Sequence, residues 1–263
     1  ESCSGRSHLI VARSPDGETN WEVADRALLH SEQGYEYEAN GVEDCRITWV
    51  PQLDAWALAY TAYTPQGAGV ALAATRDFRT VKRMGMVLPP VDKNAALFPR
   101  RFGDDFALLH RPSELSGSVW LSYSPDLVYW GKSELVLPVR EGAWWDGVRV
   151  GAGMPPIETE DGWLLVYHGV KELARAPIYR MGAALLDLEQ PHRLISRSRR
   201  WLMSPSEPYE RMGDAGNVIF SCGGFVRGDE LWMYYGAADS SVCLAKAKLP
   251  DVISMVQEEN VRG

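Results

Sequence analysis

A repeat of strand-like segments constrains the fold of this sequence more than any other feature. Aromatic and apolar segments begin at residues 56, 106, 163 and 231, so that successive segments lie 50, 57 and 68 residues apart. They read WALAYTAYT (56–64), FALLHRPS (106–113), WLLVYHGV (163–170) and LWMYYGAAD (231–239). Residues of this kind favour β-strands. A period of this length, with loop insertions, is typical of the blades of a β-propeller.

Each of these segments has a strand-like segment on either side. The segments that follow are VALAATRDF (70–78), VWLSYSPDLVYW (119–130), YRMGAALLDL (179–188) and VCLAKAKL (242–249). The segments that precede are GVEDCRIT (41–48), KNAALFP (93–99), VRVGAGMPPI (148–157) and GNVIFSCGG (216–224). One unit therefore reads as three strands and a D-G, D-L or D-F turn that leads to a further strand.

Four units are complete, and a lone segment, SHLIVARSPDG (7–17), is interpreted as the latter part of a fifth unit whose inner strands are missing from this chain. We therefore predict an all-β fold, a five-bladed β-propeller with an incomplete first blade, in which residues 1–263 form a single domain. No helix of ordinary length is predicted, because no segment has a clear 3.6-residue apolar period. A β-sandwich explains the repeat less well, because its strands recur roughly every 8–12 residues without a longer period.

The charge and the cysteines limit the partners and the compartment. Lys and Arg number 27 against 35 Asp and Glu, a net charge of −8, which argues against nucleic acid or an anionic membrane as a partner. The sequence has no apolar run of membrane-spanning length and no signal-peptide pattern. Its cysteines lie far apart, which predicts neither a metal site nor a disulfide framework but free thiols in a reducing cytoplasm. They are Cys3, Cys45, Cys222 and Cys243.

Polar residues recur at comparable places of successive units, where a propeller would present them to its central channel. Those on or beside the inner strands are Asp44, Lys93, Asn94, Arg149 and Asn217. Those near the ends of the neighbouring strands are Arg111, His168 and Asp239. Residues without a functional role would be apolar or small at these places. The pattern therefore predicts a polar site at one mouth of the channel.

The acidic members of this set also have structural interpretations. Glu43 and Asp44 form either a solvated strand edge or the acid of an active site. Because successive strand residues point to opposite faces, only one of the two is expected to face the channel. Asp239 follows a strand and is also a common turn residue.

The basic members are harder to explain as surface charge. Lys93, Arg111, Arg149 and His168 fall on three consecutive units, and together they predict an anion pocket in which arginine supplies forked donors. A single histidine at such a place, on the other hand, is commonly a hydrogen-bonded core residue. Nearby aromatic residues are mostly expected in the core, and a few of them could stack on sugars. They are Trp144, Trp145, Trp163, Tyr179, Tyr234 and Tyr235.

Over nearly its whole length the sequence resembles glycoside hydrolase family 130, which contains β-mannoside phosphorylases and related β-mannosidases. The similarity rests on GVEDCRIT, KNAALFPRR…LLHRP, VWLSYSPDLVYWG, WWDGVRVGAGMPPIETEDGWLLVYHGV, IYRMGAALLDLEQP, YERMGDAGNVIFSCGG and MYYGAADSSVCLA. The resemblance implies a five-bladed β-propeller. It departs at Cys45, where the family usually has proline, and before Ser7, where the inner strands of the first blade have no counterpart.

The resemblance also implies residue roles. Asp44 matches the general acid of the family, and Tyr179 and Asp239 match residues that line the sugar site. Asn94, beside Lys93, is a further candidate for substrate binding. The positions that match phosphate-binding residues of the phosphorylases are Lys93, Arg111, Arg149 and His168.

A single acid opposite a basic pocket predicts phosphorolysis. An inverting glycosidase needs two carboxyl groups about 6.5–9.5 Å apart, whereas phosphate is already a nucleophile and needs only a cationic cradle. We therefore predict that phosphate attacks a β-1,2- or β-1,4-linked manno-oligosaccharide, or a mannosyl-glucose, to give α-mannose 1-phosphate with inversion. The resemblance implies that the proton of Asp44 travels through the mannose 3-hydroxyl. Phosphate is the expected co-substrate, without a metal or other cofactor.

Two alternatives and the oligomeric state stay open. One alternative is a β-mannosidase of the same family that uses water, and the other is a propeller that binds glycans without catalysis. The expected partners are a β-mannoside and phosphate, and a homo-oligomer is compatible with the sequence.

Overall fold

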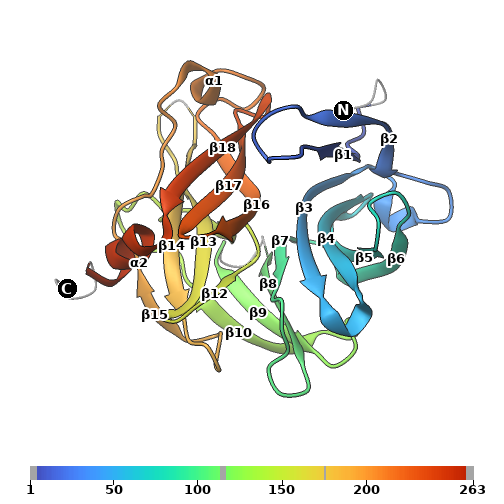
Figure 1. Ribbon diagram of the computed structural model, residues 1–263, viewed down its shortest axis with the longest axis horizontal. Coiled ribbons are helices and arrows are strands. Elements are labelled where there is room, and N and C mark those ends of the chain that lie inside the picture. The colour runs from blue at the N-terminus through green and yellow to red at the C-terminus, as the bar shows by residue number, and fades with distance from the viewer. Residues whose placement is uncertain (1–4, 113–116, 175, 259–263) are drawn as a thin grey trace.

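The computed structural model describes residues 5–112, 117–174 and 176–258, and antiparallel β-sheets surround a common centre in it (Figure 1). The first sheet contains β3 (Val42–Val50), β4 (Ala55–Thr64), β5 (Gly67–Thr75) and β6 (Lys82–Leu88). The second contains β7 (Asp92–Leu97), β8 (Phe106–Pro112), β9 (Val119–Ser124) and β10 (Gly131–Leu137). In both sheets the strands pair in chain order, as the repeat predicts.

Two further sheets complete a propeller-like arrangement of four blades. The third sheet contains β11 (Arg149–Ala152), β13 (Gly162–Lys171), β14 (Ile178–Leu186) and β15 (Leu194–Arg197), with β12 (Ile157–Thr159) paired to β13. The fourth contains β16 (Ile219–Arg227), β17 (Glu230–Ala237) and β18 (Ser241–Lys248). The all-β class and the order of the four repeats are thus confirmed.

The N-terminal segment forms a two-stranded sheet of β1 (Leu9–Arg13) and β2 (Glu22–Leu29). This hairpin lies between β3 and the fourth sheet (Figure 1). Short helical turns stand at Glu36–Glu38 (η1), Pro51–Leu53 (η2) and Pro208–Arg211 (α1).

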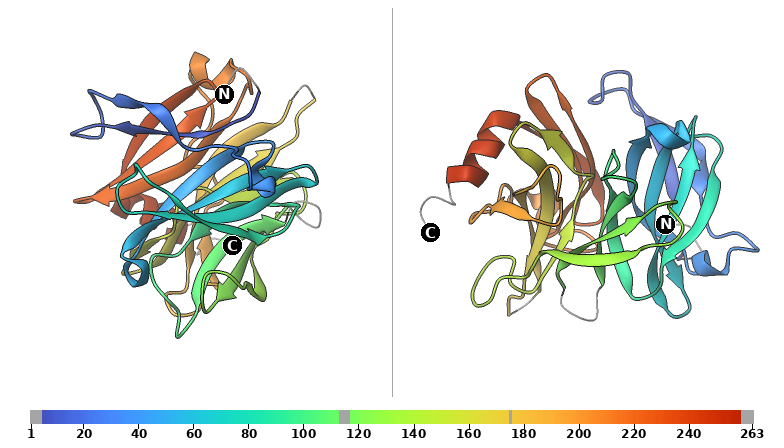
Figure 2. Two further views of the ribbon diagram at one scale, coloured as in Figure 1. Left: turned by 90° about the vertical axis from the view of Figure 1, so that its right-hand side faces the viewer. Right: turned by 90° about the horizontal axis from the view of Figure 1, so that it is seen from below.

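Two predictions about the last unit are wrong. Within the described residues the fourth sheet has three strands instead of four. The chain continues from β18 into α2 (Leu249–Glu258), a helix of ten residues that lies on the outer side of the blades (Figure 2). Val252, Ile253 and Val256 are buried in it. This apolar stripe covers less than three helical turns, which is too short for a clear 3.6-residue period to stand out.

Neighbouring blades are joined by apolar clusters. Phe98, which directly follows β7, meets Trp163 of the third sheet edge to face, with ring centroids 5.0 Å apart. Met154, Val166, Ile219 and Met233 belong to one cluster between the third and fourth sheets. Such burial stabilises by about 25 cal/mol for each Å² of apolar surface and fixes the angles between the blades.

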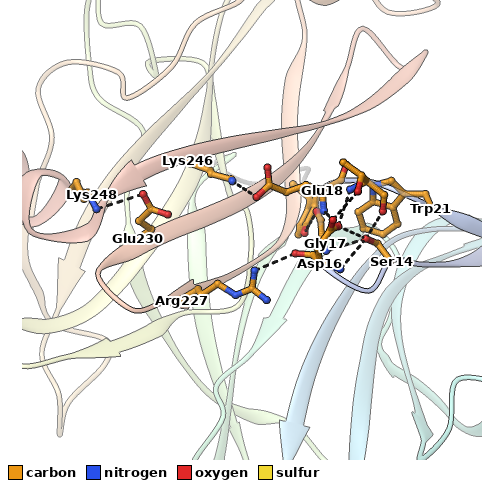
Figure 3. Close-up of polar contacts among 11 residues, drawn as sticks. Ser14, Asp16, Gly17, Glu18, Trp21, Arg227, Glu230, Lys246 and Lys248 are labelled. Carbon is orange, nitrogen blue, oxygen red and sulfur yellow. Dashed lines mark hydrogen bonds and ion pairs between the residues drawn. The ribbon is translucent and has the colours of Figure 1, made fainter.

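The hairpin meets the fourth sheet through a different kind of contact, shown in Figure 3. Arg227 donates to the carbonyl of Asp16 at 3.1 Å, and the Lys246 ammonium contacts the Glu18 carboxylate. The Tyr234 hydroxyl donates to the carbonyl of Gly17 at 2.7 Å. We call these contacts the latch. It joins segments more than 200 positions apart and closes the ring with polar side chains.

Candidate functional site

The inner strands of three blades have the same irregularity, at their beginnings or just before them. Asp44, Asn94 and Asn217 have φ values of 56°, 56° and 62°. This left-handed conformation is uncommon outside glycine, although Asp and Asn tolerate it best. The pairing register shifts between Glu43 and Arg46 on β3, and also between Lys93 and Ala96 on β7. These bulges redirect side chains, and such strained positions cluster at functional sites.

The bulge on β3 changes the expected roles of the two acidic residues. Strict alternation, which predicted one carboxylate toward the channel and one away, does not hold across a bulge. Glu43 and Asp44 are both half-buried, and both raise the pKa of Lys93 against the effect of its burial. Glu43 also accepts a hydrogen bond of 2.5 Å from Ser7 Oγ. Glu43 is therefore part of the site's surroundings and is not a solvated edge.

The cationic side chains of the predicted anion pocket lie together. Burial lowers the pKa of Lys93, and repulsion from Arg111 and Arg149 lowers it further. Burial, followed by repulsion from Arg149, lowers the pKa of Arg111 to about 10. Lys93 Nζ donates to the Tyr63 hydroxyl at 3.2 Å, and Arg149 Nη2 donates to the Tyr179 hydroxyl at 2.7 Å. Three like charges are thus held close enough to destabilise one another.

His168 joins this cluster as a neutral residue. Its ring is 1% exposed, and burial followed by the charge of Arg111 lowers its pKa well below 6.5. Nε2 lies 3.3 Å from Arg111 Nη1 and 3.4 Å from Asn94 Nδ2. Because the guanidinium can only donate, Nε2 accepts and the proton resides on Nδ1. Among the described residues, none lies within hydrogen-bonding distance of this buried Nδ1.

Two aromatic rings and a glycine hold His168 in place. Tyr179 stacks on it at 5.9 Å with an angle of 24° between the rings, and Phe220 lies 4.7 Å away. Gly151 stands directly opposite His168 on β11. A Cβ there would lie 2.4 Å from Asn94 Nδ2 and 2.5 Å from His168 Cε1, so only glycine fits. Sequence reasoning missed this residue, although a glycine inside a strand often marks such a close approach.

Arg46 is a second residue that sequence reasoning missed. It is 1% exposed and follows Asp44 by two positions on β3. Its guanidinium donates to the main-chain carbonyls of Asp44 at 2.6 Å, Ala152 at 3.0 Å and Gly153 at 3.0 Å. The sequence offered one signal for it, a charged arginine inside the strand segment GVEDCRIT.

The other candidates lie in a turn, in the core or in the latch. Asp239 is exposed in the turn between β17 and β18, with a φ of 51°. Trp145, Trp163 and Tyr235 are buried core residues. Tyr234 belongs to the latch.

A cavity of about 810 Å³ lies beside β3, apart from the basic cluster. Its apolar walls include Leu9 of the hairpin, Ile47 of β3 and Phe225 of the fourth sheet, and Cys45 contributes to them. Burial raises the pKa of the Cys45 thiol to about 12, so this residue is an unreactive apolar wall. Cys45, Cys222 and Cys243 are free thiols, and Cys3 lies outside the described residues.

Two kinds of feature are absent from the described ranges, a metal-binding group and a membrane-spanning helix. In residues 5–112, 117–174 and 176–258, no three His, Cys, Asp or Glu side chains are grouped to hold a metal ion. Within the same ranges, no helix is long and apolar enough to cross a membrane.

Comparison with known proteins identifies the family. The model of glycoside hydrolase family 130, described as beta-1,4-mannooligosaccharide phosphorylase, matches residues 4–258. A beta-1,2-mannobiose phosphorylase of Listeria innocua is 36% identical over 256 residues, covering 96% of this chain and 70% of that protein. A 1,2-beta-oligomannan phosphorylase of Thermoanaerobacter is 33% identical, covering 94% of this chain and 80% of that protein.

Solved structures agree with the sequence comparison. The Listeria innocua enzyme in complex with beta-1,2-mannobiose superimposes with a TM-score of 0.88 at 35% identity. The match covers 95% of this chain and 69% of that chain. The sequence match and the shared fold lead to one conclusion, that this chain belongs to glycoside hydrolase family 130.

Proposed function

We propose that this protein is an inverting β-mannoside phosphorylase. It transfers a mannosyl unit from a β-1,2- or β-1,4-linked mannoside to inorganic phosphate, which is its co-substrate. The observation that carries the proposal is the crowding of Lys93, Arg111 and Arg149. The charges of Arg111 and Arg149 lower the pKa of Lys93, and the charge of Arg149 lowers the pKa of Arg111. The names of the relatives, all mannoside phosphorylases, support the same substrate class.

The crowded charges favour an anion as ligand. Buried cations that repel one another are stabilised when a dianion binds among them, and arginine presents paired donors to phosphate oxygens. His168 contributes a neutral ring, which holds Arg111 through Nε2 and offers the Nδ1 proton as a donor. Phosphate held in this way loses little entropy on reaching the reacting carbon.

In the proposed reaction a phosphate oxygen bonds to the anomeric carbon while the bond from that carbon to the glycosidic oxygen breaks. The electron pair stays on the glycosidic oxygen. This oxygen takes a proton from the mannose 3-hydroxyl, which is in turn reprotonated by Asp44. Solvent returns a proton to Asp44 in the next cycle. The products are α-mannose 1-phosphate and the shortened sugar, with Asn94, Tyr179 and Asp239 binding the sugar.

We further propose that the hairpin β1–β2 is the outer part of a fifth blade in a single catalytic propeller comprising residues 1–263. An apolar cavity lies beside this hairpin, on the side that faces β3. The free thiols of the three described cysteines fit a reducing cytoplasm, where we expect the reaction to occur.

Product analysis tests the function. The purified protein is incubated with β-1,2- and β-1,4-mannobiose, with and without inorganic phosphate, and the sugar phosphates are resolved by anion-exchange chromatography. We expect turnover only with phosphate, and α-mannose 1-phosphate as the product. Equal turnover without phosphate would identify a mannosidase. Binding of mannobiose without turnover would identify a glycan-binding propeller.

A further inference from the structure

We propose that Arg46 is a positioning residue that fixes the main chain of the acid Asp44 and adds its charge to the floor of the phosphate pocket. This inference rests on the proposed function. Its starting point is the set of three main-chain carbonyls that the Arg46 guanidinium binds, from Asp44, Ala152 and Gly153.

The guanidinium connects the inner strands of three blades. Arg46 lies on β3 of the first sheet, whereas Ala152 ends β11 of the third sheet and Gly153 follows it. Phe220 of β16, in the fourth sheet, lies 5.2 Å beneath the guanidinium carbon. β3, β7 and β16 face the common centre of the molecule (Figure 1). One buried side chain therefore sets the distances between blades that contribute to the site.

The contact with Asp44 acts on the conformation of the proposed acid. Arg46 Nη1 lies 2.6 Å from the Asp44 carbonyl oxygen, the shortest of its three hydrogen bonds. Asp44 has a φ of 56°, within a bulge that interrupts the pairing of β3 with β4. A regular register would turn the side chain of Asp44 to the other face of the strand. A charged donor on this carbonyl favours the bulged conformation over the regular one.

The charge of Arg46 acts on the basic cluster. After burial and the charge of Arg111, Arg46 is the next cause that lowers the pKa of His168. Its three acceptors are neutral carbonyls, so no carboxylate in these contacts cancels its charge. Arg197, a buried arginine of β15, is instead paired with Asp146 at 2.6 Å. A purely structural arginine is better served by such a partner, because an uncompensated buried charge is costly. A bound anion would explain why the contacts of Arg46 within the described residues include no carboxylate.

Two variants separate positioning from charge, and one variant serves as a control. Arg46→Lys keeps the charge but loses the planar fork. Arg46→Gln keeps planar donors but loses the charge. Arg197→Lys makes the first change at another buried arginine, outside the site. For each, kcat and the KM for phosphate are measured per folded molecule, well below the melting temperature.

We expect kcat of Arg46→Lys to fall by about 10²-fold, because misplacing a reacting group by about 1 Å has this effect. Its KM for phosphate should stay within about threefold of wild type, since the charge is kept. Arg46→Gln should raise the KM for phosphate by about tenfold, as expected for the loss of a buried charge near an anion. Arg197→Lys should lower the melting temperature and leave both constants unchanged.

Wild-type kcat in Arg46→Lys, or an equal loss of kcat in Arg197→Lys, would overturn the inference. The crystal structure of Arg46→Lys provides a test that does not depend on the reaction. Asp44 should leave its left-handed conformation, and an unchanged Asp44 would overturn the inference whatever the enzyme does. If instead wild type turns over mannobiose equally without phosphate, the proposed function fails, and the ratio of kcat values still decides whether Arg46 positions Asp44. Should one Arg46 variant not fold, the other tests its own half of the proposal.

Discussion

A charged cluster and an apolar cavity adjoin β3, and consecutive residues of one bulge contribute to them. Asp44 acts on the charged pocket, whereas Cys45 lines the apolar cavity beside the hairpin. The pocket is built by inner strands whose blades are joined through apolar clusters, so its charges stay crowded and ordered. The latch borders the cavity, and its exposed polar side chains hold the hairpin to the fourth sheet. Apolar contacts between blades therefore support the proposed site, whereas the polar contacts of the latch involve none of its residues.

The largest expected effect comes from removing Asp44, the proposed proton donor. Asp44→Asn should lower kcat by about 10²–10⁴-fold, the range for loss of a general acid. Glu43→Gln is the matched control and should lower kcat by less than about tenfold, because its carboxylate accepts from Ser7. Steady-state kinetics with mannobiose and phosphate measure both. If Glu43→Gln shows the greater loss, the proton comes from Glu43.

The next effect tests how tightly the pocket is packed. Gly151→Ala places a Cβ 2.4 Å from Asn94 Nδ2 and 2.5 Å from His168 Cε1, so both side chains must move. We expect a loss of about 1–3 kcal/mol in the free energy of unfolding, measured by urea denaturation, and a higher KM for phosphate. In the control, Gly131→Ala, the new Cβ meets no described atom within 4 Å, so stability should hold. Similar losses in both variants would mean that the packing around His168 is not special.

The third prediction concerns pH. The pKa of His168 lies well below 6.5 in the folded protein, so below pH 6.5 the unfolded chain takes up the proton first. The free energy of unfolding should therefore decrease as the pH is lowered below about 6.5. The decrease is up to about 1.4 kcal/mol per pH unit for this one group. Urea denaturation between pH 7 and pH 5 measures the slope. His168→Gln should flatten it, and an unchanged slope would show that the ring is already charged when folded.

The sequence predicted the blades better than the details of the site. The repeat identified the second strand of each blade, because strands buried between neighbouring blades are rich in aromatic and apolar residues. It also brought Lys93, Arg111, Arg149 and His168 to one place. The alternation of strand residues did not predict the bulge at Asp44, because the bulge depends on how β3 pairs with β4. The roles of Gly151 and Arg46 were not predicted either, because their partners come from other strands of the folded protein.

The smallest expected effect tests the latch. Tyr234→Phe removes the hydroxyl that donates to the Gly17 carbonyl at 2.7 Å and keeps the edge-to-face contact with Trp21. A single hydrogen bond of this kind stabilises by about 0.5–1.5 kcal/mol, so the hairpin should open about two- to tenfold more often. Hydrogen exchange of the β1 and β2 amides measures this opening. Tyr129→Phe, at a side chain that is 77% exposed, makes the same change away from the latch and should leave exchange unaltered. Because none of the latch contacts involves Asp44 or Lys93, kcat should stay at the wild-type value. A parallel fall in kcat would mean that the charged cluster and the apolar cavity are coupled through the bulge on β3.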